Sequence, residues 1–160
     1  MVAPSPHASL TLNVSRVFEA PRERVFRAWT DPRLLERWWG PPGFKCPLAQ
    51  VDLRTGGAYR LGMQPPVGET FYLGGVFREV NPPERLVYTW KWEEDTEATG
   101  ETLVTVEFKD LGTRTEVVLT HERFPDAGAV GRHGDGWNGC LESLAQLLAH
   151  THPEPSNTKE

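Results

Sequence analysis

One histidine is placed where it could act on a bound molecule. In the predicted strand 113–122, His121 follows Val117 and Leu119 at every second position, so the three side chains point to the same covered face. A histidine there could donate to, accept from or exchange a proton with a ligand. The alternative, which we rank first, is a histidine near a strand end that is hydrogen-bonded to the backbone or to an aromatic neighbour.

A row of aromatic residues supplies the second candidate chemistry. In the predicted strand 86–93, Tyr88, Trp90 and Trp92 recur at every second position and share one face. Such rings stack on flat apolar ligands, and the O–H and N–H groups of Tyr and Trp orient them, although the same rings can equally fill a core. We predict that a ligand cavity is lined by Tyr59, Phe77, Tyr88, Trp90, Phe108, His121 and Trp137.

Two further tryptophans, Trp38 and Trp39, are consecutive at the end of a predicted short helix. On a helix, neighbouring side chains point about 100° apart, so both cannot face the same cavity. We therefore expect one of them in the core and the other at the rim of the cavity.

Motifs that would indicate one catalytic class are absent from the sequence, including the nucleophile elbow, the His-Glu-x-x-His pair and the phosphate-binding loop. Cys46 and Cys140 lie far apart and are expected to be reduced thiols rather than a zinc site or a disulfide. The run Glu93-Glu94-Asp95 is expected to be a solvated turn rather than a metal site. We expect no metal and no cofactor, although acid–base catalysis needs only one histidine or tyrosine and leaves no motif.

Length and charge narrow the class of protein. The 160 residues fit one domain, predicted over 10–150, and the segments 1–9 and 151–160 are expected to be flexible tails. A formal net charge of −5 argues against nucleic acid and anionic membranes as partners. The chain has no signal-peptide pattern and no apolar run near twenty residues. We expect a cytoplasmic protein, and a homodimer stays open as an alternative to a monomer.

The hydrophobic periodicity predicts one strand, two short helices, six more strands and a long helix. The first strand covers residues 10–18. Pro21 is predicted in the first turn of a helix that ends near Thr30, and Asp31 is predicted to cap a second short helix that begins at Pro32. The strand 70–80 is apolar on both faces and is left without an orientation. Turn residues separate the six strands, which are predicted at 48–54, 58–64, 70–80, 86–93, 101–109 and 113–122.

The long helix is predicted over residues 126–150. Trp137, Leu141, Leu144 and Leu148 recur at helical spacing and give it a broad apolar face. Its first half contains five glycines, each of which costs about 1 kcal/mol relative to alanine in a helix interior. We expect this half to fray or move. Trp137 is expected to be the first structural anchor of the helix, and a role as a gate beside the glycines is the alternative. A curved sheet around such a helix is expected to leave a cavity.

These features, in this order, closely resemble one family. The likeness rests on the segments 17–31, 38–41, 79–90 and 136–148 and covers residues 10–149. The chain is similar to the START-like (SRPBCC, Bet v 1-type helix-grip) domains of the group named for the carboxy-terminal domain of the activator of the 90-kDa heat-shock protein ATPase. This resemblance implies an α+β fold with the element order β-α-α-β6-α, in which a curved antiparallel sheet wraps around a long C-terminal helix.

The resemblance implies several functions, because members of this superfamily bind lipids, sterols and polyketides, cyclise aromatic precursors, sequester toxic compounds or assist a chaperone. Our first expectation is a protein that binds a small hydrophobic or aromatic ligand between the sheet and the C-terminal helix. The second is a cavity enzyme of the aromatase/cyclase or hydrolase type that uses His121. The third is a chaperone-ATPase-activator-like interaction domain. It ranks last because 160 residues leave no room for the partner-anchoring domain of the eukaryotic co-chaperone.

Overall fold

The computed structural model describes residues 10–96 and 98–150, so the predicted tails at 1–9 and 151–160 lie outside the described residues. The described part is an α+β fold, as expected from the sequence. Its elements in chain order are β1 (Leu12–Phe18), α2 (Arg22–Thr30), α3 (Pro32–Trp38), β2 (Ala49–Val51), β3 (Ala58–Met63), β4 (Phe71–Asn81), β5 (Arg85–Trp92), β6 (Thr102–Asp110), β7 (Thr115–Glu122) and α4 (Ala127–His150).

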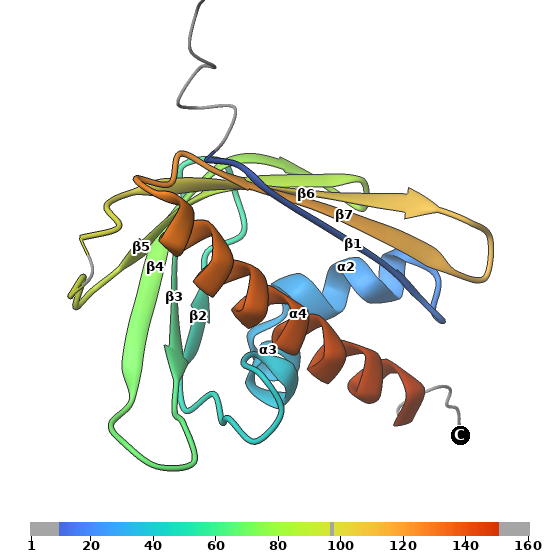
Figure 1. Ribbon diagram of the computed structural model, residues 1–160. Coiled ribbons are helices and arrows are strands. Elements are labelled where there is room, and N and C mark those ends of the chain that lie inside the picture. Colours follow the sequence, from blue (N-terminus) through green and yellow to red (C-terminus); the bar gives the residue numbers. More distant parts are fainter. Residues whose placement is uncertain (1–9, 97, 151–160) are drawn as a thin grey trace, which may run out of the picture.

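The strands form one seven-stranded antiparallel sheet with the order β1-β7-β6-β5-β4-β3-β2. The strands β2 to β7 are the predicted meander, and β1 joins it by pairing with β7, with Leu12 opposite His121. Figure 1 shows that the sheet is strongly bent and that α4 and the two short helices lie on its concave side. The predicted helix-grip architecture is therefore confirmed.

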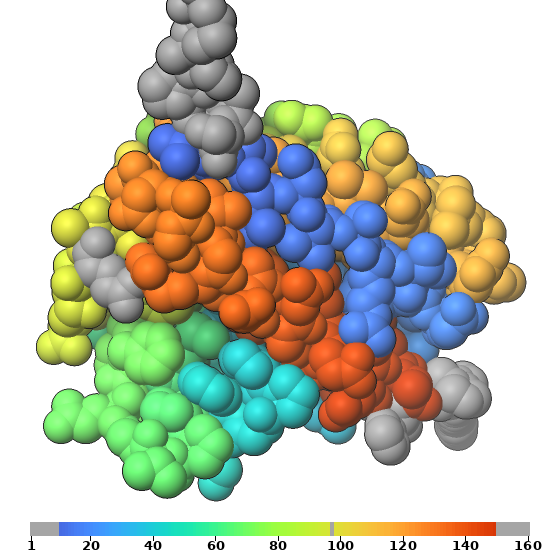
Figure 2. Space-filling model, in the orientation of Figure 1, coloured from blue at the N-terminus to red at the C-terminus, as the bar shows by residue number. Residues whose placement is uncertain are grey.

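The core lies between the concave face of the sheet and the helices. In β7 the buried side chains alternate strictly with half-buried ones, so His121 faces inward with Val117 and Leu119, and Val118 faces the wetter side. The inner side of α4 contributes Trp137, Cys140, Leu141, Leu144 and Leu148, all buried. Figure 2 shows the outer side of α4 at the surface, with β1 along one flank. Among the described residues, no helix has both the length and the apolar character to cross a bilayer.

Local sequence signals explain most element boundaries. Asp31 caps α3 as predicted, because its carboxylate accepts a hydrogen bond from the Arg33 backbone N–H at 2.9 Å and Pro32 is the first helical residue. The prediction for Pro21 is wrong by one position. With φ −68° and ψ 158° it is extended, and it precedes α2 as the N-cap while its carbonyl accepts the first helical N–H groups.

Strand β2 is shorter than the predicted 48–54. The chain turns after Val51, where the Asp52 N–H donates to the Ala58 carbonyl and the Arg54 N–H donates to the Asp52 carbonyl. These two bonds close the turn into β3, so residues 52–54 have left the sheet ladder.

A bulge accounts for the end of the apolar pattern on both faces of β4, whereas Tyr72 and Val76 lie on its outer face before the bulge. Leu73 and Phe77 are buried, and the register with β5 shifts just after Phe77, so the inward face passes to Val80, which packs against the core. Upstream of the bulge, Gly75 lies very close to β5. A Cβ atom at Gly75 would come within 2.0 Å of the Thr89 carbonyl oxygen, so only glycine fits there.

Candidate functional site

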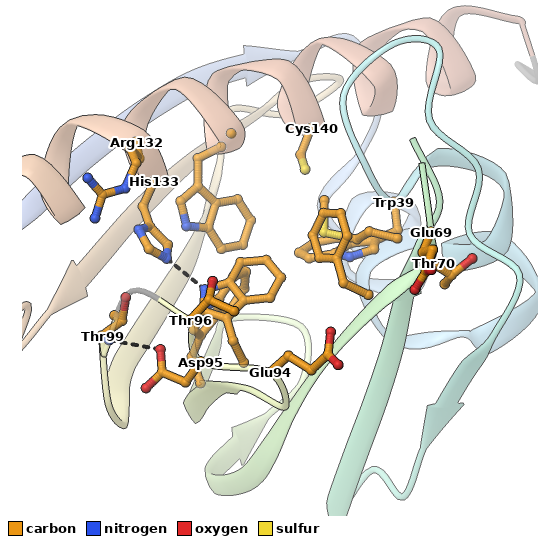
Figure 3. Close-up of a pocket in the computed structure, with 16 residues that line it drawn as sticks. Trp39, Glu69, Thr70, Glu94, Asp95, Thr96, Thr99, Arg132, His133 and Cys140 are labelled. Carbon is orange, nitrogen blue, oxygen red and sulfur yellow. Dashed lines mark hydrogen bonds between the residues drawn. The ribbon is translucent and has the colours of Figure 1, made fainter. Parts of the chain in front are cut away.

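A pocket of about 430 Å³ opens between the first half of α4 and the sheet, beside the β5–β6 connection (Figure 3). Its floor comes from β5 and α4, and its sides come from the end of β3, the start of β4 and the residue after α3. The described lining residues are Trp39, Met63, Glu69, Thr70, Phe71, Trp90, Trp92, Glu94, Asp95, Thr96, Thr99, Arg132, His133, Gly136, Trp137 and Cys140.

Four tryptophans make the apolar wall of this pocket. Trp90 is at the centre, with its ring centroid 5.9 Å from that of Trp39, 5.5 Å from Trp92 and 5.2 Å from Trp137. Trp90 and Trp92 come from alternate positions of β5, whereas Trp137 lies on the inner face of α4. Three separate elements therefore bring their indoles to one place, and the spacing along β5 accounts for two of them.

The prediction for Trp38 and Trp39 is confirmed for the core residue, which is Trp38, and is wrong for Trp39, which is buried rather than at the rim; the two are 2% and 3% exposed. Trp39 is the C-cap of α3 and has an extended backbone, with ψ 123°, so the helical angle of about 100° between neighbours does not apply to it. Trp38 donates its indole N–H to the Ala28 carbonyl at 2.8 Å and belongs to the core. Trp39 lines the pocket.

His121 is fully buried behind the pocket and does not line it. The Trp137 indole N–H donates to His121 Nδ1 at 3.0 Å, so Nδ1 acts as an acceptor and the ring proton belongs on Nε2. Nε2 lies 2.7 Å from Thr102 Oγ1, whose hydroxyl can donate to the Trp90 carbonyl at 3.2 Å. Burial above all, and His133 nearby, hold the pKa of His121 well below its usual value. His121 is thus a neutral ring whose two nitrogens are both occupied.

His133 is a pocket residue that the sequence reasoning missed. Its Nδ1 lies 2.8 Å from the Ala129 carbonyl, four residues earlier on α4, and its Nε2 accepts the Trp92 indole N–H at 2.9 Å. Figure 3 shows this bond across the pocket floor. A signal was available, because His133 precedes Trp137 by four residues and so lies on the same face of α4.

The rim of the pocket is polar and mostly acidic, with Glu69, Glu94 and Asp95 opposite Arg132 (Figure 3). Asp95 accepts the backbone N–H groups of Thr99 and Gly100 at 2.8 and 2.7 Å, which closes the turn after β5. The Gly100 N–H is the main cause that lowers the pKa of Asp95. Within the run 93–95, which we predicted to be a solvated turn, Glu94 and Asp95 also line the rim of the pocket.

Two of the seven predicted ligand-binding residues, Trp90 and Trp137, line the large pocket. Tyr59, Phe77 and Tyr88 instead surround a second void of about 20 Å³, deeper under the sheet, which has room for no more than about one water. Tyr59 donates to the Thr89 carbonyl at 2.6 Å, and burial raises its pKa well above the usual value.

The remaining predicted residue, Phe108, lines neither space. It packs edge-on against Phe26 and Trp29, with ring centroids 5.2 and 5.7 Å apart, and is 2% exposed. Tyr88 accepts the Trp29 indole N–H at 3.2 Å, and burial raises its pKa well above the usual value. Burial also raises the pKa of the Cys140 thiol to about 12, so this pocket residue is a protonated thiol at neutral pH.

Within residues 10–96 and 98–150, no group of three His, Cys, Asp or Glu side chains is placed to hold a metal ion.

Comparison with known proteins bears on the fold and the family. The family model described as "Activator of Hsp90 ATPase homolog 1-like protein" matches residues 19–149. A crystal structure of a protein from Chromobacterium violaceum is 33% identical, with a TM-score of 0.78 over 86% of this chain and 96% of that one. An AHSA1 protein from Silicibacter pomeroyi is 29% identical, with a TM-score of 0.79 over 89% and 99%.

A further similar structure is titled an HSP90 activator from Plasmodium falciparum. It is 28% identical, with a TM-score of 0.70 over 88% of this chain and 96% of that one. A search of functionally curated proteins finds no match.

Proposed function

Because this chain belongs to the family of activator of Hsp90 ATPase homolog 1-like proteins, we propose that it uses the helix-grip fold to bind a small, largely apolar molecule in the tryptophan-lined pocket. The observation that carries the proposal is the pocket itself. Its volume of about 430 Å³ falls in the range of small-molecule sites, which are typically mostly apolar with a few polar groups.

The tryptophan wall favours a flat or aromatic ligand. Indole rings offer large rigid surfaces for offset stacking, and four of them surround one space. Gly136 adds room, because its position on α4 lines the pocket and a side chain there would meet no atom within 4 Å. The polar rim would leave the outer end of the ligand near water.

We propose no catalytic role for His121. A general acid or base must come within hydrogen-bond reach of the reacting group, and both nitrogens of this buried ring already have partners, Trp137 and Thr102.

A second candidate function is interaction with a chaperone. It is favoured by the family description and by the similarity to the structure titled an HSP90 activator. Stimulation of an Hsp90 ATPase by the purified protein would support it. Stimulation that persists when the pocket is filled by mutation would assign that activity to a surface other than the pocket.

The test of ligand binding fills the pocket without disturbing its walls. Gly136→Leu projects a side chain into the open space, so saturable binding of the neutral fluorescent probe N-phenyl-1-naphthylamine should weaken by about tenfold or more. Gly131→Leu is the matched control, because it lies on the same helix, is exposed and meets nothing within 4 Å. Equal affinity in both variants, or no saturable binding to the unmodified protein, would refute the proposal.

A further inference from the structure

The hydrogen bonding of the six tryptophans divides them into two groups. The indole N–H groups of Trp29, Trp38, Trp92 and Trp137 donate to a tyrosine oxygen, a backbone carbonyl and two histidine nitrogens respectively. Those of Trp39 and Trp90 are buried and have no acceptor among the described residues. Both side chains are nearly sealed, at 3% and 4% exposure.

Unpaired buried donors are uncommon, because a donor that leaves water without finding a new acceptor loses its hydrogen bond to water and destabilises the folded state. Two of them on neighbouring rings, 5.9 Å apart between centroids, are more notable than one. An acceptor from outside the described protein, either a ligand atom or a bound water, would remove this cost for both.

The position of the pair points to the ligand. Trp39 and Trp90 are the two residues that, within the described chain, line both the large pocket and the small void beneath it. They form the partition between the two spaces. Turning either ring breaks no hydrogen bond of its indole, whereas Trp92 and Trp137 are held by His133 and His121. Among the four tryptophans of the wall, the two at the partition can therefore turn without the loss of an indole hydrogen bond.

Building on the function proposed above, we propose that the ligand carries an acceptor oxygen of the carbonyl type, which receives the indole N–H groups of Trp39 and Trp90 at this partition. A carbonyl oxygen has two lone pairs and can accept both bonds. The ligand class is then an apolar, largely aromatic compound with a ketone, ester or quinone oxygen at its inner end. The deep void, lined by Tyr59 and Tyr88, gives that end space when the rings part.

The test compares two probes of the same ring system, naphthalene and 2-acetylnaphthalene, which differ by an acetyl group. Both are titrated into ¹⁵N-labelled protein while the six indole N–H resonances are followed, with those of Trp39 and Trp90 assigned from Trp39→Phe and Trp90→Phe. We expect the ketone to move these two resonances downfield and naphthalene to leave them near their starting positions. Each variant should bind the ketone about fivefold more weakly and naphthalene within about twofold of the unmodified protein.

The binding of the two probes tests the carbonyl acceptor and the pocket function separately. Retained naphthalene binding shows that a variant still folds and still has its pocket. If naphthalene binds but the ketone binds equally well to all the proteins, the inference is wrong while the pocket function stands. If neither probe binds the unmodified protein, both the inference and the proposed function are wrong.

Discussion

The prediction that separates the two kinds of tryptophan most directly is a comparison of Trp137→Phe with Trp90→Phe in folding stability. Both changes remove an indole from the pocket wall and leave a phenyl ring, so they lose similar apolar surface. Trp137 also donates to His121 Nδ1, whereas the Trp90 N–H has no acceptor among the described residues. The difference between the variants therefore reports the hydrogen bond.

The magnitude follows from what each change leaves behind. In Trp137→Phe, the bond is lost and a buried ring nitrogen of His121 is left unsatisfied, which costs about 1–3 kcal/mol beyond the lost packing. In Trp90→Phe an unsatisfied donor disappears, so the packing loss stands alone or is partly offset. We expect Trp137→Phe to be the less stable variant by about 2 kcal/mol, which for a domain of this size corresponds to about 4–8 °C in Tm.

The assay is urea unfolding at pH 7.5, followed by far-UV circular dichroism because this signal does not depend on the number of tryptophans. Equal midpoints and slopes for the two variants, or a less stable Trp90→Phe, would refute the reasoning. That outcome would mean that Trp90 does have an acceptor in solution, and it would also weaken the case for a ligand carbonyl at the partition.

Three further predictions test other parts of the fold. The folded-state pKa of His121 is depressed, so the neutral ring stabilises the fold above the unfolded pKa of about 6.5. As the pH falls below that value, the free energy of unfolding decreases by up to about 1.4 kcal/mol per pH unit. His121→Gln should flatten this slope in urea unfolding between pH 7.5 and 5, and an unchanged slope would contradict the assignment. Gly75→Ala should destabilise the protein by about 3 kcal/mol in the same assay, because the added Cβ would overlap the Thr89 carbonyl oxygen of β5. A decrease in the free energy of unfolding of less than about 1 kcal/mol would show that β4 and β5 can separate. Asp95→Ala should speed hydrogen exchange at the Gly100 amide, which donates to this carboxylate, and unchanged protection would mean that the turn holds without it.

The fold could be predicted from the sequence because its signals are local and repeated. Alternation along β7, the Asp31 cap with Pro32 behind it, and the apolar spacing from Trp137 to Leu148 each fix one element independently. The errors occur where a boundary depends on backbone bonds that periodicity does not encode. Residues 52–54 leave the sheet at a turn that is closed by the bonds from the Asp52 N–H to the Ala58 carbonyl and from the Arg54 N–H to the Asp52 carbonyl.

The site was harder to predict. The alternation of apolar and polar residues along a strand indicates which face of the sheet a side chain lies on, but not where along the sheet the pocket lies. Tyr88, Phe108 and His121 face the concave side as predicted, yet they lie where side chains fill the interior, or behind the pocket. The pocket lies at the end of β5, where Trp90 faces α4. Its histidine, His133, and its fourth tryptophan, Trp39, come from α4 and from the residue after α3, and the tertiary fold brings them to the end of β5.

The glycines of α4 affect both the stability of this helix and the shape of the pocket. A glycine inside a helix costs about 1 kcal/mol relative to alanine, yet α4 runs unbroken from Ala127 through all five. At Gly139, a Cβ would lie 2.7 Å from the Cβ of Pro41, so the missing side chain lets the corner after α3 approach the helix and carry Trp39 to the pocket. At Gly136, the missing side chain leaves the pocket open. The composition that predicts a weak helix therefore also creates the space in which a ligand would bind.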